Sequence, residues 1–206
     1  MSRLAAIVGG DGEYEAVPIL VRRIALALDP GLIPVVHPVL RVPESRLIKQ
    51  GELERTVELA ANKMGGQGGI LILLDCDDGC PAEDGPALLR RAVAARSDIP
   101  ISVVLAKREF EAWFLAAAES LRGRRGLPGD LTSPPDPEAV RGAKEWLADR
   151  MPQDQAYSET ADQPALTSLF DLEAARRADS FDKCYREIVR LLKHFSAKTQ
   201  RGRGTR

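Results

Sequence analysis

The sequence predicts an α/β fold, in which a Rossmann-like parallel sheet of about four strands is flanked by helices and followed by a helical C-terminal part. Short apolar runs alternate with amphipathic stretches in the first half of the chain, which is typical of strand–helix–strand units. The second half begins with a stretch rich in Gly and Pro and then shows helical periodicity without a clear strand pattern. We therefore expect an α/β core over residues 1–121, a helical part packed on it over residues 122–197, and a disordered basic tail over residues 198–206.

Four apolar runs are the predicted strands, at residues 4–8, 32–40, 70–74 and 101–106. The second run contains two prolines, which cannot donate to a hydrogen-bonded ladder, so it is expected at an edge of the sheet. The other three lack proline and are almost wholly apolar, as strands buried on both faces of a parallel sheet should be.

The segments between and after these strands have the periodicity of amphipathic helices. The first places Val17, Leu20, Val21 and Ile24 on one stripe and ends at Asp29-Pro30-Gly31, a strong stop signal. The expected helices cover residues 14–28, 52–64, 86–95 and 109–121 in the core and residues 137–150, 163–177 and 181–195 in the second half, with a loop at 41–50.

Composition indicates an ordinary globular protein. The chain has 206 residues, 44% hydrophobic and 29% charged. Its formal net charge of −1 gives no global signature of nucleic-acid binding, so only a local basic surface could bind nucleic acid. Three cysteines without framework spacing favour a reducing compartment. No apolar run is long enough for a signal peptide or a membrane span. We therefore expect a cytoplasmic protein without a membrane partner.

Acidic residues follow three of the predicted strands where each strand ends. They are Glu13 after the first strand, Asp75 and Asp77 after the third, and Glu109 and Glu111 after the fourth. The carboxyl ends of parallel strands meet at one edge of the sheet, where ligands bind, and carboxylate oxygens are preferred by hard divalent cations. Two carboxylates about 4 Å apart repel by roughly 4 kcal/mol at an effective dielectric near 20. A convergent cluster therefore needs bound cations, basic partners or raised pKa values.

Some of these positions also have a structural interpretation. An Asp at a strand end, such as Asp78, can cap the next helix or complete a turn. Glu109 and Glu111 fall in the first turn of a predicted helix, where the helix dipole favours negative charge. A functional site is favoured for Asp75 and Asp77, because both follow a buried strand directly.

Several other motifs are incomplete. The run Gly9-Gly10-Asp11-Gly12 lacks the third glycine of a dinucleotide-binding loop, and no G-x-x-x-x-G-K-[ST] motif is present. Cys76 and Cys80 cannot complete a zinc site, since the chain has only two histidines and nothing else with suitable spacing. Nicotinamide, P-loop and zinc chemistry are therefore disfavoured.

Five short motifs span nearly the whole chain, namely Val8–Glu15, Leu73–Pro81, Arg108–Phe114, Asp162–Pro164 and Ser180–Lys183. Together they resemble the Toprim domain of primases, topoisomerases and overcoming-lysogenization-defect (OLD) nucleases, and most closely a bacterial Toprim-like family of unknown function. The resemblance implies a Toprim-type parallel sheet.

The resemblance also implies a site for Mg²⁺ (or Mn²⁺). Asp75 and Asp77 match the metal ligands of the Toprim Asp-x-Asp motif, and Glu13 matches a second acidic position that serves as ligand and catalytic residue. Glu109 and Glu111 resemble the later acidic pair of the OLD-type nucleases, which serves a second metal.

On the same resemblance, Lys183 would stabilise the charged transition state, whereas Gly9 stands where Toprim enzymes ordinarily have a catalytic Glu. The expected function is a Mg²⁺-dependent nuclease or related phosphoryl-transfer enzyme acting on nucleic acid, in a bacterial phage-defence system. The alternative is a non-catalytic Toprim-like partner subunit of an ABC-type ATPase. A small-molecule phosphohydrolase stays open as a third interpretation.

Overall fold

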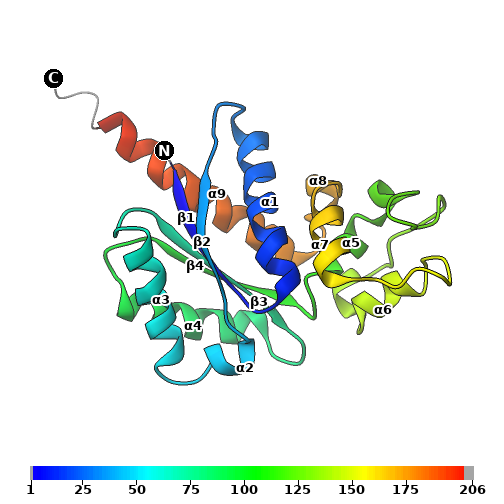
Figure 1. Cartoon of the computed structure of the whole chain (residues 1–206), viewed down its shortest axis with the longest axis horizontal. Helices are drawn as coiled ribbons and strands as arrows, with labels where there is room; N and C mark the ends of the chain where they lie inside the picture. The colour runs from blue at the N-terminus through cyan, green and yellow to red at the C-terminus, as the bar shows by residue number, and fades with distance from the viewer. Residues whose placement is uncertain (1, 202–206) are drawn as a thin grey trace.

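The computed structural model describes residues 2–201, with side chains described to residue 194. Its sheet has four parallel strands in the order β2-β1-β3-β4 (Figure 1). The strands are β1 (Arg3–Val8), β2 (Val35–Arg41), β3 (Gly69–Cys76) and β4 (Ile101–Lys107). This confirms the predicted α/β, Rossmann-like fold and the edge position of the proline-containing strand.

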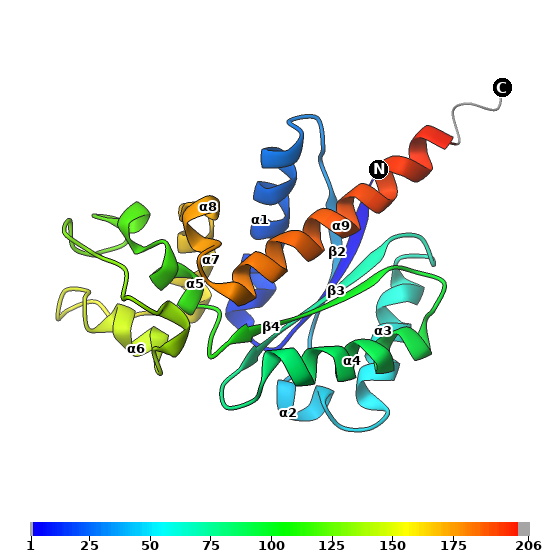
Figure 2. The same cartoon turned by 180° about the vertical axis from the view of Figure 1, so that it is seen from behind.

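Helices cover both faces of the sheet, and alternate strand residues feed two separate cores. In β1, Leu4, Ala6 and Val8 pack with α1 (Asp11–Leu28) and α9 (Asp179–Arg201), whereas Ala5 and Ile7 face the other side. That second face is covered by α3 (Glu52–Lys63) and α4 (Pro81–Ala95) (Figures 1 and 2). The period of two along each strand therefore delivers apolar side chains to both layers.

Three elements of the first half differ from the expectation. The loop expected at 41–50 contains a short helix, α2 (Glu44–Leu47). Helix α4 begins at Pro81 instead of residue 86, because a proline at the start of a helix loses no intrahelical hydrogen bond. The helix expected at 109–121 is split into α5 (Ala112–Ala116) and a 3-10 turn, η1 (Ala118–Leu121).

The second half of the chain completes one face of the sheet. Its elements are η2 (Pro137–Ala139), α6 (Ala143–Ala148), α7 (Glu159–Thr167), α8 (Leu172–Ala175) and α9. Helix α7 packs on α1, and α9 runs along β4 and α1 (Figure 2). Helix α9 continues to Arg201, so residues 198–201 of the expected tail are helical, and residues 202–206 lie outside the described part of the chain. None of the described helices has both the length and the apolarity that crossing a bilayer requires.

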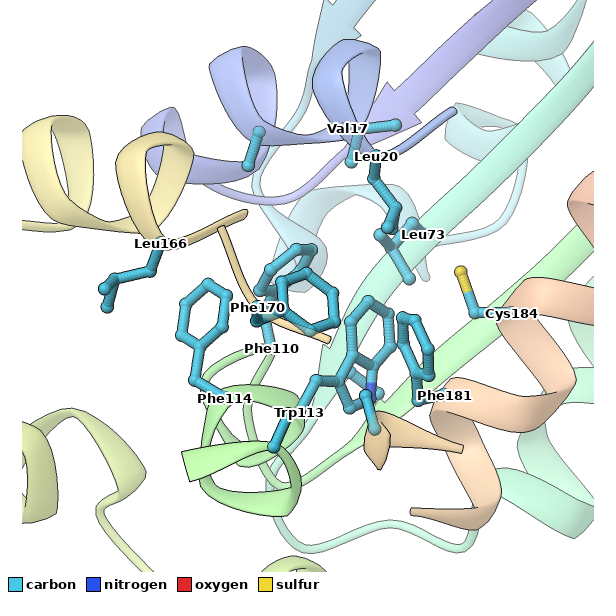
Figure 3. Close-up of a cluster of buried hydrophobic side chains, with 14 of the residues drawn as sticks. Val17, Leu20, Leu73, Phe110, Trp113, Phe114, Leu166, Phe170, Phe181 and Cys184 are labelled. Atoms are coloured by element: carbon cyan, nitrogen blue, oxygen red, sulfur yellow. The ribbon is translucent and has the colours of Figure 1, made fainter. Parts of the chain in front are cut away.

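An aromatic cluster joins the two halves (Figure 3). Its fully buried members are Phe110, Trp113, Phe114, Phe170 and Phe181. Their rings meet in tilted and edge-to-face pairs with centroids 4.5–5.5 Å apart, a favourable geometry for aromatic rings. The indole Nε1 of Trp113 donates to Ser180 Oγ at 2.8 Å, so α5 and α9 are also tied by a buried hydrogen bond.

Candidate functional site

The candidate site lies where β1 and β3 end. In the order β2-β1-β3-β4, the chain leaves β1 toward one edge of the sheet and β3 toward the other, so a crevice forms between their carboxyl ends. Glu13 comes from the first turn of α1, directly after β1, and Asp75 is the penultimate residue of β3. The topology therefore brings together the acidic residues that the sequence predicted after the first and third strands.

Three carboxyl groups interact at this point. The pKa of Asp75 is raised well above its ordinary value, first by burial of the carboxyl group and then by the negative charges of Glu13 and Glu111. Burial also raises the pKa of Glu111 to about 7. The Phe110 backbone N–H donates to Asp75 Oδ1 at 2.8 Å and holds this carboxyl group in place. Glu13, Asp75 and Glu111, which we call the carboxylate centre, thus converge as expected.

Two residues that we did not predict complete the surroundings of the carboxylate centre. The positive charge of Lys144 in α6 offsets part of the rise that burial causes in the pKa values of Asp75 and Glu111, and its ammonium group also pairs with Glu159 at 2.9 Å. The Tyr157 hydroxyl donates to Glu111 Oε1 at 2.8 Å. Burial, followed by the charge of Glu111, raises the pKa of Tyr157, so its hydroxyl remains a donor.

The carboxylate centre contains oxygens without a partner. Glu13 is 6% exposed and Glu111 is 0% exposed, yet Oε2 of each lacks a hydrogen-bond partner within the described residues. A buried polar atom that is left unpaired costs free energy, so such atoms usually mark the place of a missing partner. Among the side chains described, no three His, Cys, Asp or Glu residues form a group that could hold a metal ion. The oxygens are present, but a metal cage is not preformed.

Asp77 lies away from the carboxylate centre. It is exposed and, with Glu44 and Asp84, lines a cavity of about 390 Å³ on the α2 and α4 side. Burial and then the charges of Asp77 and Asp84 raise the pKa of Glu44. The separation arises because β3 ends at Cys76, which bridges to Arg108 across the strand ends. Asp77 therefore does not join Asp75, contrary to our expectation for the Asp-x-Asp motif.

Glu109 and Lys183 make contacts other than those that the resemblance implied. Glu109 Oε2 accepts from the Lys144 backbone N–H at 3.0 Å, in the first turn of α6, which is a helix-capping role. Lys183 Nζ lies 3.2 Å from the position that a Cβ on Gly85 would take, beside α4. Among the charges that act most strongly on Asp75 and Glu111, the positive one is Lys144.

Two glycines that follow β1, Gly9 and Gly12, allow a matched pair of stability variants. Gly12→Ala is expected to lower the free energy of unfolding by about 1–3 kcal/mol, because its Cβ would overlap Gln163 Oε1 and lie 3.0 Å from the Glu159 carbonyl oxygen. Gly9→Ala is the control, since its Cβ would meet only Leu74 Cδ2 at 3.8 Å. Urea unfolding of both variants tests the packing, and equal losses would contradict it.

The fold and the site define a class of protein: an α/β protein with a buried carboxylate centre at the switch point of a parallel sheet. The chain belongs to the family described as Domain of unknown function (DUF4276), whose model matches residues 8–188. Comparison with curated proteins and with solved structures gives no significant match. The family description carries no activity, so a function has to be argued from the site.

Proposed function

We propose that the protein is a Mg²⁺- or Mn²⁺-dependent phosphoryl-transfer enzyme acting on nucleic acid, with Glu13, Asp75 and Glu111 as the residues that hold the cation. The observation that carries the proposal is the pair of buried, unpartnered oxygens of Glu13 and Glu111, whose charges both act on Asp75. A divalent cation would give these oxygens a partner and offset the repulsion between the carboxylates.

The donor chemistry of the carboxylate centre fits a hard cation. Carboxylate oxygens are the ligands that Mg²⁺ prefers, and side-chain rotations of Glu13 and Glu111 would be needed to gather them around an ion. When bound, such an ion would polarise a phosphodiester and lower the pKa of a water molecule. Because the pKa values of Asp75 and Glu111 are raised, cation binding near neutral pH is expected to release protons.

The surrounding residues of the chain supply positive charge and orientation. Lys144 can neutralise charge that develops on a phosphate, and Tyr157 keeps Glu111 oriented through its hydroxyl. Three arginines at the same end of the sheet, Arg41, Arg108 and Arg141, pair with exposed aspartates and are the local basic groups that a nucleic-acid backbone could contact. The motif resemblance to OLD-type nucleases supports a place in phage defence.

The second candidate is a non-catalytic partner subunit of an ABC-type ATPase. Two observations favour it: Gly9 has no side chain where Toprim domains carry a Glu, and the described residues contain no preformed three-ligand group. In this case the carboxylate centre would bind a cation weakly or remain protonated, and the fold would serve for association.

The test combines Mn²⁺ calorimetry with hydrolysis of single- and double-stranded DNA and RNA. The double variant Glu13→Gln/Asp75→Asn is expected to weaken Mn²⁺ binding more than about 100-fold, the upper range seen when even supporting groups of metal sites are removed. It should also abolish hydrolysis.

The control Asp77→Asn/Asp84→Asn removes the same charge from the other face and should retain both properties. Mn²⁺ binding without hydrolysis in wild-type protein would favour the second candidate. Unchanged Mn²⁺ binding in Glu13→Gln/Asp75→Asn would contradict the assigned site.

A further inference from the structure

Two arginines converge on one exposed carboxylate just beyond the carboxyl ends of β3 and β4. Asp78 Oδ1 lies 2.8 Å from Arg141 Nη1 and 3.6 Å from Arg108 Nη1. The Asp78 side chain is 78% exposed and that of Arg141 is 68% exposed, so a partner in solution can reach both groups. Ion pairs at such exposed positions contribute little to stability. The arrangement is therefore easy to open.

Asp78 does not cap α4, the helix that follows it. The N-cap of α4 is Cys80, and the backbone N–H of Cys80 donates to Asp84 Oδ2 at 3.0 Å. The Asp78 carboxylate instead accepts from Arg141, and this hydrogen bond and the charges of Arg141 and Arg108 hold the pKa of Asp78 below its ordinary value. The structural interpretation of a strand-end aspartate thus does not account for Asp78.

The conformation of Arg108 is a second, independent sign of a ligand. Its φ is 70°, a left-handed conformation that residues other than Gly rarely adopt and that is concentrated at functional sites. Its Nε is buried and has no hydrogen-bond partner within the described residues. The Arg108 guanidinium group therefore keeps a donor that Asp78 does not use.

We propose that Arg108 and Arg141 form a clamp for a backbone phosphate of a nucleic-acid strand, and that Asp78 occupies the clamp until the strand binds. The fork of N–H donors on a guanidinium group matches phosphate as well as carboxylate, so a carboxylate can stand between the same two arginines in place of a phosphate. The inference rests on the proposed function in one respect, because it takes the strand to be the substrate of the carboxylate centre.

The clamp lies next to the carboxylate centre. Arg108 and Cys76 exchange backbone hydrogen bonds of 3.0 and 3.3 Å, and Cys76 follows Asp75 directly. Arg141 precedes α6, whose Lys144 acts on Asp75 through its charge. A strand held by the clamp would therefore run past the carboxylate centre. Because the clamp consists of guanidinium groups, it should bind the strand without a divalent cation.

The test is the fluorescence anisotropy of a labelled single-stranded oligonucleotide, as DNA and as RNA, in EDTA. Asp78→Asn weakens two ion pairs and should tighten binding about three- to tenfold, as expected for weak surface pairs. Asp77→Asn is the matched control, because Asp77 is exposed next to Asp78 but meets Arg108 through its backbone oxygen. It should change the affinity about twofold or less, since a screened charge acts weakly. Equal changes in the two variants, or no binding by either variant and wild type, would overturn the inference.

A double-mutant cycle assigns the effect to the arginines. Arg141→Gln should weaken binding about tenfold and reduce the dependence of log K on log salt by about 0.7, the value for one phosphate contact on a single strand. In the Arg141→Gln background, Asp78→Asn should lose most of its effect. Arg55→Gln removes an exposed arginine that pairs with Glu52 in α3 and should bind as wild type.

Two results of these titrations would contradict the clamp. One is an undiminished effect of Asp78→Asn in the Arg141→Gln background. The other is displacement of the oligonucleotide by inorganic phosphate at an equal concentration of phosphate groups, because the clamp would then be a site for free phosphate.

The failure of the two proposals is distinguishable. Strand binding that depends on Arg141 in a protein that takes up no Mn²⁺ would remove the cation and leave the clamp. Hydrolysis that depends on Glu13 and Asp75, with unchanged strand affinity in Arg141→Gln, would remove the clamp and leave the carboxylate centre.

Discussion

The Glu111→Gln variant is expected to exceed the wild-type protein in unfolding free energy by about 3 kcal/mol at pH 8 when divalent cations are chelated. Burial raises the pKa of Glu111 from its ordinary 4.5 to about 7 in the folded state. Between these two values the folded protein binds more protons than the unfolded chain, so wild-type stability falls as pH rises through this window. The amide introduced by Glu111→Gln carries no charge at any pH, and this loss should therefore be absent from the variant.

Urea unfolding of both proteins from pH 4 to pH 8 measures this difference. The two curves should run together near pH 4 and separate by pH 8, and saturating Mg²⁺ should stabilise the wild-type protein more than the variant. Glu119→Gln is the control, because hydrogen bonds from Ser133 lower the pKa of Glu119. The stability that Glu119 contributes should therefore increase with pH, opposite to that of Glu111. A stability difference that is constant over the whole pH range would contradict the burial of a titrating Glu111.

Trp113→Ala is expected to lower the free energy of unfolding by about 3–5 kcal/mol, the range found when a buried aromatic side chain is truncated. Trp113 is fully buried against Phe110 and Phe181, and its Nε1 donates to Ser180 Oγ (Figure 3). The substitution would leave a cavity in the cluster that joins the two halves of the chain. It would also disturb Phe110, whose backbone N–H holds Asp75, so cation binding should weaken as well.

The other tryptophan provides the comparison for this variant. Trp146 is only partly buried, and the Arg150 guanidinium lies 3.6 Å from its ring centroid. Trp146→Ala is expected to cost less than Trp113→Ala, since Trp146 packs only partly against the core and loses a surface cation–π contact besides. Urea unfolding measures the loss of stability in both variants, and an unchanged m-value shows that a shifted midpoint reports stability alone. Equal losses in both variants would contradict the central role of the aromatic cluster.

The strands were predictable because each is a short apolar run that a parallel sheet buries on both faces. The start of α5 at Ala112 was not, because Glu109 and Phe110 have ordinary helical neighbours, and only tertiary contacts decide where the helix begins. The Glu109 carboxylate accepts from the first turn of α6, whereas the Phe110 backbone N–H donates to Asp75 from a segment that precedes α5. Helix propensity alone does not predict which of these tertiary contacts forms.

The candidate site was predictable where its residues follow the predicted strands, as Glu13, Asp75 and Glu111 do. Glu13 and Asp75 converge because parallel topology places them there. The extension to Asp77 assumed that spacing of two keeps side chains on one face, which holds only while a strand continues, and β3 ends at Cys76. Lys144 and Tyr157 reach Glu111 from more than thirty residues away, and no local pattern marks either one.

The central claim is that Glu13, Asp75 and Glu111 together hold one divalent cation. Anomalous scattering from Mn²⁺-soaked crystals tests it most directly. We predict a peak at coordination distance from these three carboxylates, between the carboxyl ends of β1 and β3. A peak confined to the Glu44, Asp77 and Asp84 cavity on the other face, or no peak at a concentration that saturates binding in solution, would contradict the claim.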